Sequence, residues 1–215
     1  MEQAAGFEKI LAEGASQLGL SLTTDHLAQF ARHLRELQHW NAKINLTAIT
    51  DEREIAVKHF LDSLICSRAL VEAPRGPLLD IGSGAGFPGL PLKVYLPRLS
   101  VTLLEPNQKK TAFLRHVVGT LQLTDVSVVS TRIEDLAKWL DYSHHFVHIV
   151  SRALDATQVA SSITPLLASA GQLILYRSKP LDSQPLSGLT LVKEITYELP
   201  FGHGKRVLSL LQPGH

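Results

Sequence analysis

Hydrophobic residues recur at helical spacing in the first third of the chain. Apolar side chains three or four residues apart share one face of a helix, and such a series runs through Leu27, Phe30, Leu34 and Leu37. Residues that favour a helix start stand directly before it, at 23–25. A second helix is predicted to begin at Asp51, which can form a capping box with Glu54, and to end near the Pro-Arg-Gly-Pro segment at 74–77.

After residue 77 the pattern changes to short apolar runs that alternate with helical stretches. The runs cover residues 78–81, 101–104, 126–129, 146–150 and 173–176. The helical stretches between them cover 90–96, 109–118, 134–140 and 157–167. This alternation indicates βαβ units and therefore an α/β fold with a doubly wound, mostly parallel sheet.

The C-terminal part of the chain follows a different pattern. Two strand-like runs, 189–197 and 205–210, follow one another without a helix between them. They predict an antiparallel strand pair that closes a seven-stranded sheet. We therefore expect a helical N-terminal extension over residues 1–74 and a Rossmann-like domain over residues 75–215.

Composition and charge narrow the class of protein only a little. The chain has 215 residues, 45% of them hydrophobic, which suits one sizeable domain with a small appendage. One cysteine excludes an intramolecular disulfide framework, and a net charge of +1 neither supports nor excludes contact with nucleic acid. The N-terminus lacks the pattern of a signal peptide, and no apolar run reaches a membrane-spanning length. A cytoplasmic protein is therefore expected.

The segment after the first predicted strand is the clearest candidate for a ligand site. The apolar run ends in Asp80, and glycine then recurs at every second position, at Gly82, Gly84 and Gly86. Glycine can adopt a positive φ, and it lets a ligand approach where a Cβ atom would collide. Open parallel sheets hold adenosine-containing cofactors at this end of a strand. A nucleotide-like cofactor is therefore predicted here.

Three features, two in this segment and one in the C-terminal strands, favour S-adenosyl-L-methionine over a dinucleotide. The dinucleotide fingerprint also matches and ends at Gly89, but the glycine series already begins at Gly82, directly after the strand. Pro88 and Pro91 flank the last glycine, which is unusual for a helix that receives a pyrophosphate on its N–H groups. The antiparallel strand pair also suits a methyltransferase better than a dehydrogenase.

Two acids follow the next two strands. Glu105 ends the second strand, where a carboxylate can accept hydrogen bonds from the ribose of either cofactor. Glu134 follows the third strand, where the adenine would lie. The alternative for Glu134 is an ordinary acid at a helix N-terminus, which the helix dipole favours.

Further motifs recur in one order along the chain. They are Trp40-Asn41, Asn45-Leu46-Thr47, His59-x-x-Asp62-Ser63, the run from Gly82 to Leu92, Lys109-Lys110 with Phe113-Leu114, and Ser151-Arg152-Ala153. From about Leu27 to about Leu175 the chain thus resembles the RsmG (GidB) family of bacterial ribosomal RNA methyltransferases. The resemblance implies a class I Rossmann-like methyltransferase fold. It also implies methyl transfer from S-adenosylmethionine to N7 of a guanine in 16S ribosomal RNA, naked or within the small ribosomal subunit.

The resemblance also implies where the cofactor is bound. Carried over to this sequence, the family's cofactor contacts fall on Gly82, Phe87, Ile133, Glu134 and Arg152. The family often has Ala-Glu where this chain has Ile-Glu, and a main-chain contact would survive that change. Where the family has a Lys-Gly pair after the fifth strand, this chain has Arg177-Ser178-Lys179-Pro180. Which of these residues replaces that lysine is left open.

Methylation of guanine N7 needs alignment rather than a general base, because N7 carries a lone pair and no proton. We therefore expect catalysis to come mainly from proximity. Arg152 follows the fourth strand, in the crevice where such sheets bind ligands. We expect it to position the cofactor and the target, since a cation beside the purine would oppose the charge that methylation leaves. The alternative is that Arg152 only caps its strand through a salt bridge.

Contacts with RNA are less readable from the sequence. Basic residues cluster at three places, which are Arg32 with His33 and Arg35, Lys109 with Lys110 and Arg115, and Lys205 with Arg206. Such clusters can bind phosphate, but solvated helix faces look the same.

Two groups of polar residues are discounted as separate catalytic or metal sites. His59, Asp62 and Ser63 have the residue types of a hydrolase triad, yet they lie within one helical turn without a nucleophile elbow. They are interpreted as a polar helix edge that lines the cleft or docks the N-terminal segment on the sheet. His144 and His148 are predicted to share a strand face, but no third ligand is evident, so no metal is expected.

Alternatives to the main functional hypothesis remain at this point. The chain could methylate another RNA or a small molecule, because such folds share a cofactor site and differ in their loops. It could also be a cofactor-binding module for ribosome assembly with little catalysis, or, more remotely, a nicotinamide-dependent oxidoreductase. The nucleotide that is modified and the oligomeric state are not visible in the sequence.

Overall fold

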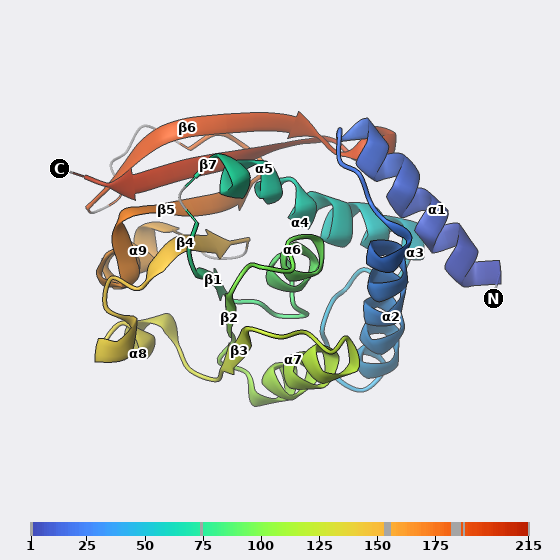
Figure 1. The fold of residues 1–215 in the computed structure, drawn as a ribbon, viewed down its shortest axis with the longest axis horizontal. Coiled ribbons are helices and arrows are strands. Elements are labelled where there is room, and N and C mark those ends of the chain that lie inside the picture. Colours follow the sequence, from blue (N-terminus) through green and yellow to red (C-terminus); the bar gives the residue numbers. More distant parts are fainter. Residues whose placement is uncertain (1, 74, 153–155, 182–185, 187, 215) are drawn as a thin grey trace.

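One seven-stranded sheet organises the protein, in the order β3-β2-β1-β4-β5-β7-β6. The computed structural model describes residues 2–73, 75–152, 156–181, 186 and 188–214. The strands are β1 Leu78–Ile81, β2 Val101–Leu104, β3 Val126–Val129, β4 Phe146–Ser151, β5 Leu167–Arg177, β6 Leu189–Glu198 and β7 Lys205–Pro213. Strands β1 to β5 pair in parallel, and β7 lies antiparallel to both β5 and β6 (Figure 1). The predicted doubly wound sheet with an antiparallel closing pair is confirmed.

Helices precede the sheet and connect its strands. The N-terminal ones are α1 Glu2–Gln17, α2 Thr24–Asn41, α3 Glu52–Ile55, the π-helix η1 Ala56–Leu61, α4 Asp62–Leu64 and α5 Cys66–Glu72. Those within the sheet domain are α6 Gly89–Tyr95, α7 Gln108–Thr120, α8 Ile133–Leu136 and α9 Ala156–Ile163. Short 3-10 turns lie at η2 Leu140–Tyr142, η3 Thr164–Leu166 and η4 Pro200–Gly202.

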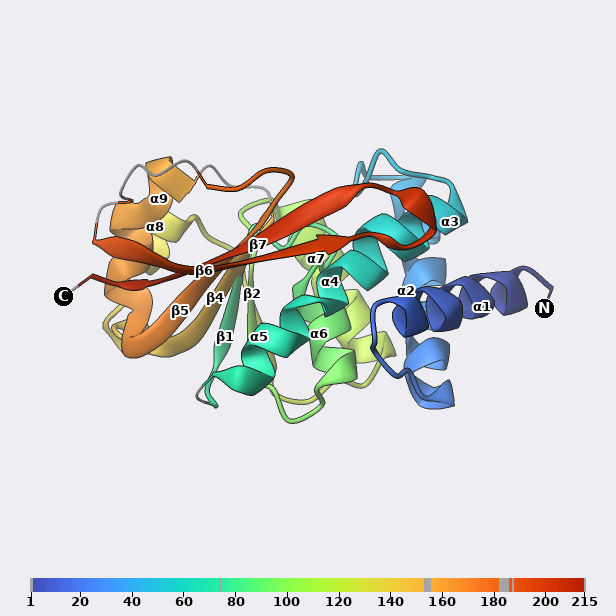
Figure 2. The same ribbon diagram turned by 90° about the horizontal axis from the view of Figure 1, so that it is seen from above.

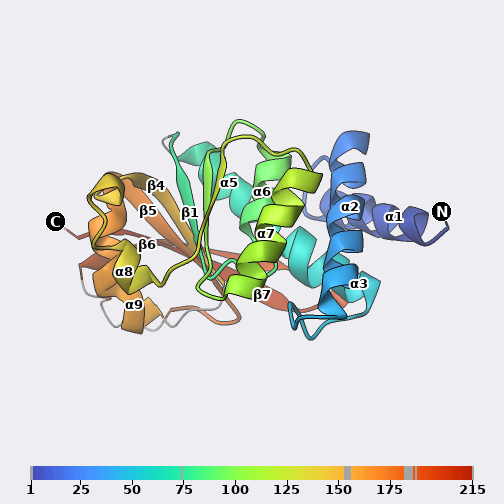
Figure 3. The ribbon, with the colours of Figure 1, turned by 90° about the horizontal axis from the view of Figure 1, so that it is seen from below.

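The two faces of the sheet bury separate hydrophobic clusters. Helices α6 and α7 cover one face together with the N-terminal helices, and α8 and α9 cover the other (Figures 1 and 3). Neighbouring residues of a strand point to opposite faces, so Leu78 joins the first cluster and Leu79 the second. Both are fully buried. The sheet is therefore the middle layer of three.

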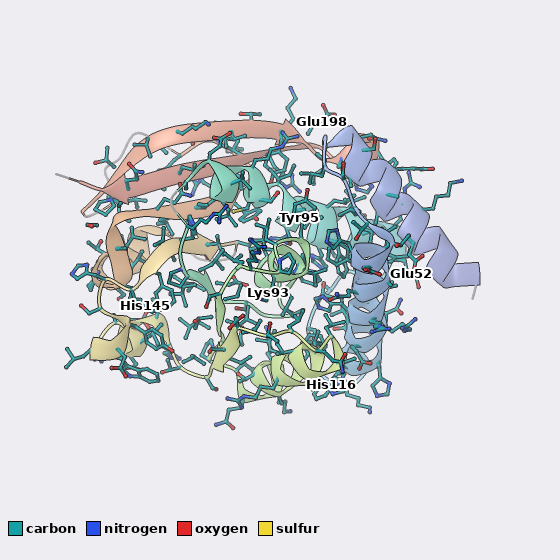
Figure 4. The ribbon with its side chains drawn as sticks, in the orientation of Figure 1. Glu52, Lys93, Tyr95, His116, His145 and Glu198 are labelled. Carbon is teal, nitrogen blue, oxygen red and sulfur yellow. The ribbon has the colours of Figure 1, made fainter. Side chains whose placement is uncertain are left out.

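The N-terminal helices pack directly on the sheet domain. Thr23 caps α2 by accepting a hydrogen bond from the His26 N–H, as the sequence predicted for this helix start. At the other end of α2, Glu36 bonds to His116 of α7 at 2.6 Å, and Figure 4 shows His116 at this junction. The helices before residue 73 share one continuous core with the first sheet face. The predicted domain boundary falls at residue 74, outside the described residues.

Several details differ from the sequence expectation. β5 begins at Leu167, so it is longer than the predicted strand over 173–176 and includes the last residue of the predicted helix over 157–167. The predicted helix over 134–140 is only the single turn α8, followed by the 3-10 turn η2. His144 precedes β4 and has a φ of 50°, so the prediction that it shares a strand face with His148 is wrong. His144 instead hydrogen-bonds to the Leu167 carbonyl. Among the described residues no group of His, Cys, Asp and Glu side chains could hold a metal ion.

The single cysteine, Cys66, is buried, and burial raises the pKa of its thiol to about 12. None of the helices in the described part of the chain combines the length and the apolar character needed to cross a membrane.

Candidate functional site

The glycine-rich turn after β1 faces open space at its first two glycines. Gly82 and Gly84 have φ values of 72° and 55°, a region that other residues rarely adopt. A Cβ atom built on Gly82 would meet nothing within 4 Å, and one on Gly84 would meet only the Gly82 carbonyl, at 3.8 Å. Gly86 differs, because a Cβ there would lie 2.3 Å from the Leu90 Cδ1 atom. Gly86 therefore serves the packing of α6, whereas Gly82 and Gly84 leave a cradle for a ligand.

Two carboxylates hold this turn in place. The Glu105 Oε2 atom accepts a hydrogen bond from the Gly84 N–H at 3.0 Å, and its Oε1 atom accepts one from the Asn107 N–H at 2.9 Å. The Asp80 Oδ2 atom accepts one from the Gly89 N–H at 2.9 Å. Both acids are buried, which fixes the turn between the ends of β1 and β2.

Asp80 is the more deeply buried of the two acids. Burial raises the pKa of its carboxyl to about 7, and the negative Glu105 adds to the rise. Its Oδ1 atom is buried without a hydrogen-bond partner among the described residues. Asp80 thus lies beneath the turn, where it shapes the backbone that the glycines expose.

Parallel pairing brings the other predicted residues to the same edge of the sheet. The C-terminal ends of β3, β2, β1 and β4 are neighbours in the sheet. Ile133 and Glu134 begin α8 shortly after β3, and Arg152 follows β4 directly. The Ile133 side chain is buried among residues of the second face, and Glu134 is exposed. A ligand could therefore reach the Glu134 side chain and the main chain at Ile133. Ala153, which completes the Ser151-Arg152-Ala153 motif, lies outside the described residues.

Phe87 packs between the turn and the N-terminal helices. Its ring stacks on His33 of α2 with centroids 5.0 Å apart, and on His59 of η1 with centroids 4.8 Å apart. The Phe87 side chain is buried, so only its main chain is left to contact a ligand. The His33 ring also hydrogen-bonds to the Ala85 carbonyl, at 3.0 Å. The N-terminal helices thereby brace the turn from behind.

Both histidines are neutral in this environment. Burial lowers the pKa of His33 to about 4, and burial together with the nearby Arg152 lowers that of His59 to about 4. His59 also bonds to the Thr47 hydroxyl at 2.9 Å. The interpretation of His33 as part of an RNA-binding cluster is therefore wrong, because its side chain is 1% exposed and uncharged. A signal for this was present in the sequence, because His33 lies three residues after Phe30 and so shares the apolar helix face with Leu37.

Arg152 is held by the helix edge at residues 58–63. Its guanidinium forms an ion pair with the Asp62 Oδ2 atom at 3.1 Å and donates to the Lys58 carbonyl at 2.7 Å. It also donates to the Ser63 hydroxyl, at 3.3 Å. The salt bridge that was the alternative for Arg152 is thus present, and it fixes the guanidinium at the mouth of a cavity.

The triad-like residues dock the N-terminal helices on the sheet. Asp62 accepts a hydrogen bond from the Tyr197 hydroxyl of β6 at 2.6 Å, and the Ser63 carbonyl accepts one from the Tyr176 hydroxyl of β5. Burial raises the pKa values of both tyrosines, so both remain protonated donors. The docking role predicted for this edge is confirmed. The π-helix η1 leads into it, and such helices occur frequently at functional sites.

The amino-acid sequence that forms this site matches a known protein family. Residues 26–188 match the family described as rRNA small subunit methyltransferase G. The chain belongs to this family. Relatives named ribosomal RNA small subunit methyltransferase G agree with it. The one from Roseiflexus castenholzii is 44% identical over 79% of this chain and 73% of its own. The one from Dehalococcoides mccartyi (strain CBDB1) is 38% identical over 94% of this chain and 89% of its own length.

Solved structures with low sequence identity share the fold of this family member. A mutant of MtNAS in complex with S-adenosylmethionine is 16% identical, covers 97% of this chain and 88% of its own, and has a TM-score of 0.60. A SAM-dependent methyltransferase from Aquifex aeolicus is 14% identical and has a TM-score of 0.53; the match covers 70% of this chain and 91% of the other. The Rossmann-like methyltransferase fold is therefore confirmed.

The residues of this rRNA methyltransferase family member fit S-adenosylmethionine. The cradle above Gly82 and Gly84 is open where a Cβ atom would block a ligand. Glu105 stands beside it, and each of its oxygens retains a second lone pair for a ribose hydroxyl. An open glycine cradle beside a hydrogen-bond acceptor suits the ribose of a nucleoside.

Proposed function

We propose that this protein transfers a methyl group from S-adenosylmethionine to N7 of a guanine in the 16S ribosomal RNA of the small subunit. Membership of the rRNA methyltransferase family supports the reaction class and the substrate. The observation that carries the proposal is the open glycine turn beside Glu105, with Arg152 fixed one strand away at the same edge of the sheet. We further propose that the protein works in the cytoplasm, where its substrate is assembled.

The cofactor supplies a methyl group bound to a positively charged sulfur, and the guanine N7 lone pair can attack it without losing a proton. The protein therefore has to align two partners and exclude water. Preorganised alignment is worth several kcal/mol of the barrier, up to roughly 7–11. The rigid turn between the two buried carboxylates provides that preorganisation on the cofactor side.

We assign the cofactor contacts to three parts of the sheet edge. Gly82, Gly84 and the Phe87 main chain would approach the cofactor, with Glu105 on its ribose. Ile133 through its main chain and Glu134 would lie beside the adenine. Gly86 and Asp80 act beneath the turn, through packing and through the Gly89 N–H.

Arg152 is proposed as a positioning residue rather than an acid or base. Its side chain is 21% exposed and lines a cavity, while Asp62 and the Lys58 carbonyl hold its guanidinium. A cation in direct contact with the reacting ring would oppose the positive charge of the product. We therefore place Arg152 on the phosphate, the sugar or the cofactor carboxylate.

The test measures methyl transfer and cofactor affinity on the same variants. Labelled S-adenosylmethionine is offered with 16S RNA, naked and as intact small subunits, to the wild type, Arg152→Ala and Arg98→Ala. Arg98 lies in the loop before β2, at the N-terminal ends of the parallel strands and so away from the proposed site, and serves as the control for loss of an arginine charge. We expect label in the RNA with the wild type and Arg98→Ala, and a lower kcat with Arg152→Ala. Absence of label in every substrate, despite cofactor binding, would refute the proposed function.

A further inference from the structure

A cavity of about 500 Å³ adjoins Arg152 on the side away from the glycine turn. Its walls come from the end of β4, the end of β5 and the start of β7, together with α4. Because β7 runs antiparallel to β5, its first residues lie at the same sheet edge as the last residues of β5. In Figure 2 these ends of β5 and β7 lie beside the N-terminal helices. The cavity therefore lies in line with the cofactor cradle along one edge.

Four cationic side chains line this cavity and face one carboxylate. The cations are Arg152, Arg177, Lys179 and Arg206, and the carboxylate is Asp62. Asp62 is already engaged, because it pairs with Arg152 and accepts the Tyr197 hydroxyl. Within the described ranges, no ion pair involves the other three cations. The cavity therefore carries uncompensated positive charge.

The two outer arginines are held in place by backbone groups rather than by acids. The Arg177 Nε atom donates to the Lys179 carbonyl at 3.2 Å, and an Arg206 terminal nitrogen donates to the Lys205 carbonyl at 2.9 Å. These bonds occupy one donor of each guanidinium and leave the others for a ligand. A planar guanidinium matches phosphate oxygens in geometry as well as in charge.

We propose that this cavity is a phosphate subsite that binds the sugar–phosphate backbone of the substrate RNA next to the target nucleotide. This inference rests on the proposed function, and it adds Arg206 and Lys179 to the residues that recognise the substrate. Strands in a sheet are about 4.8 Å apart, so β1 and β7, three positions apart, are separated by roughly 14 Å. A short stretch of RNA backbone spans that distance.

Residue 206 lies beyond residues 26–188, the range over which the chain matches the family description. The sequence placed Lys205 and Arg206 in one basic cluster, and the structure separates them. Neighbouring residues of a strand point to opposite faces, and only Arg206 lines the cavity. Lys205 is therefore a matched control, with the same charge on the same strand and next to the cavity residue.

The experiment measures binding of in vitro transcribed 16S RNA at several KCl concentrations between about 50 and 250 mM. The proteins are the wild type, Arg206→Gln, Lys179→Gln, Arg206→Lys and Lys205→Gln. The slope of log affinity against log salt is negative, and the loss of one phosphate contact should make it shallower by about 0.7–0.9. We expect the shallower salt slope in Arg206→Gln and in Lys179→Gln. In both variants the KM for RNA should also rise at least fivefold, while kcat is retained. Arg206→Lys should recover the slope, and Lys205→Gln should match the wild type.

The same variants identify the anion that the cavity binds. S-adenosylmethionine affinity is measured by calorimetry, and we expect it to stay within twofold of the wild type. A weaker cofactor affinity with unchanged RNA binding would overturn the inference, because the cavity would then hold the cofactor carboxylate. Identical slopes in Arg206→Gln, Lys205→Gln and the wild type would overturn it as well.

These outcomes are separate from the fate of the proposed function. If the wild type binds RNA but transfers no methyl group to it, the proposed function fails, while the effect of Arg206→Gln on the salt slope still decides the subsite. Thermal unfolding of each variant checks that the fold is retained.

Discussion

Replacing Gly84 by alanine tests whether the glycine turn is a cofactor cradle. The substitution adds one Cβ atom on the open side of the turn, where the nearest atom would be the Gly82 carbonyl oxygen at 3.8 Å. No side chain would be displaced. Any effect beyond backbone strain must therefore come from a ligand that occupies the open space.

The matched control is Gly202→Ala at the turn before β7. Gly202 has a φ of 76°, compared with 55° for Gly84, and a Cβ there would meet nothing within 4 Å. A non-glycine residue in this left-handed region costs about 1–2 kcal/mol. Both variants should therefore lose the same stability, which corresponds to a fall in Tm of roughly 2–8 °C in a chain of this size.

Only Gly84→Ala should change the affinity for S-adenosylmethionine. Forcing a methyl group into a filled contact costs about 1–3 kcal/mol, which is roughly a 5- to 150-fold rise in Kd. Calorimetric titration of both variants at one temperature measures it, and differential scanning calorimetry measures their stability. Equal Kd values for Gly84→Ala, Gly202→Ala and the wild type would refute the cradle.

Three further substitutions separate packing, titration and positioning. Gly86→Ala should lower the free energy of unfolding by about 1–3 kcal/mol through overpacking, because its Cβ would lie 2.3 Å from the Leu90 Cδ1 atom. A thermal unfolding midpoint equal to that of Gly84→Ala would contradict this. His33 has a pKa lowered to about 4 by burial, so the unfolded state binds more protons between pH 4 and 6.5 and stability falls as the pH drops through that window. Urea unfolding at pH 7 and at pH 5 measures how much free energy of unfolding is lost between the two pH values. This loss should be about 2 kcal/mol larger in the wild type than in His33→Gln, and equal losses would contradict the buried neutral state. Asp62→Asn keeps an acceptor for Tyr197 but removes the charge opposite Arg152, so kcat should fall on the order of 100-fold; an unchanged kcat would sink the positioning role.

Local patterns were sufficient to predict most of the sheet. The alternating runs gave β1, β2 and β3 at their observed bounds, because each is a short apolar run flanked by turn residues; β1 and β2 are buried, whereas β3 lies at the edge of the sheet and is only partly buried. The extension over residues 1–74 was expected to be helical, but α1 was not predicted as a separate helix, although Phe7, Leu11 and Ala15 follow a helical spacing and are buried. That stripe is narrow, and its burial depends on η1, against which Phe7 packs through the Phe60 ring.

The contacts that complete the candidate site depend on residues far apart in the sequence. His33 and Phe87 are separated by 54 positions, and only the docking of α2 on the turn makes that histidine buried and neutral. The ion pair between Asp62 and Arg152 likewise joins α4 to the end of β4. Motif resemblance placed residues at the correct strand ends, whereas tertiary packing decided which side chains support the turn and which face a ligand.

Identification of the methylated nucleoside tests the central claim most directly. Small subunits are incubated with the protein and labelled S-adenosylmethionine, and the 16S RNA is then digested to nucleosides and separated by mass spectrometry. We predict label in 7-methylguanosine, and a rate that falls with Gly84→Ala but not with Gly202→Ala. Label in a different nucleoside, or no label with a protein that binds the cofactor, would contradict guanine-N7 methylation by this chain.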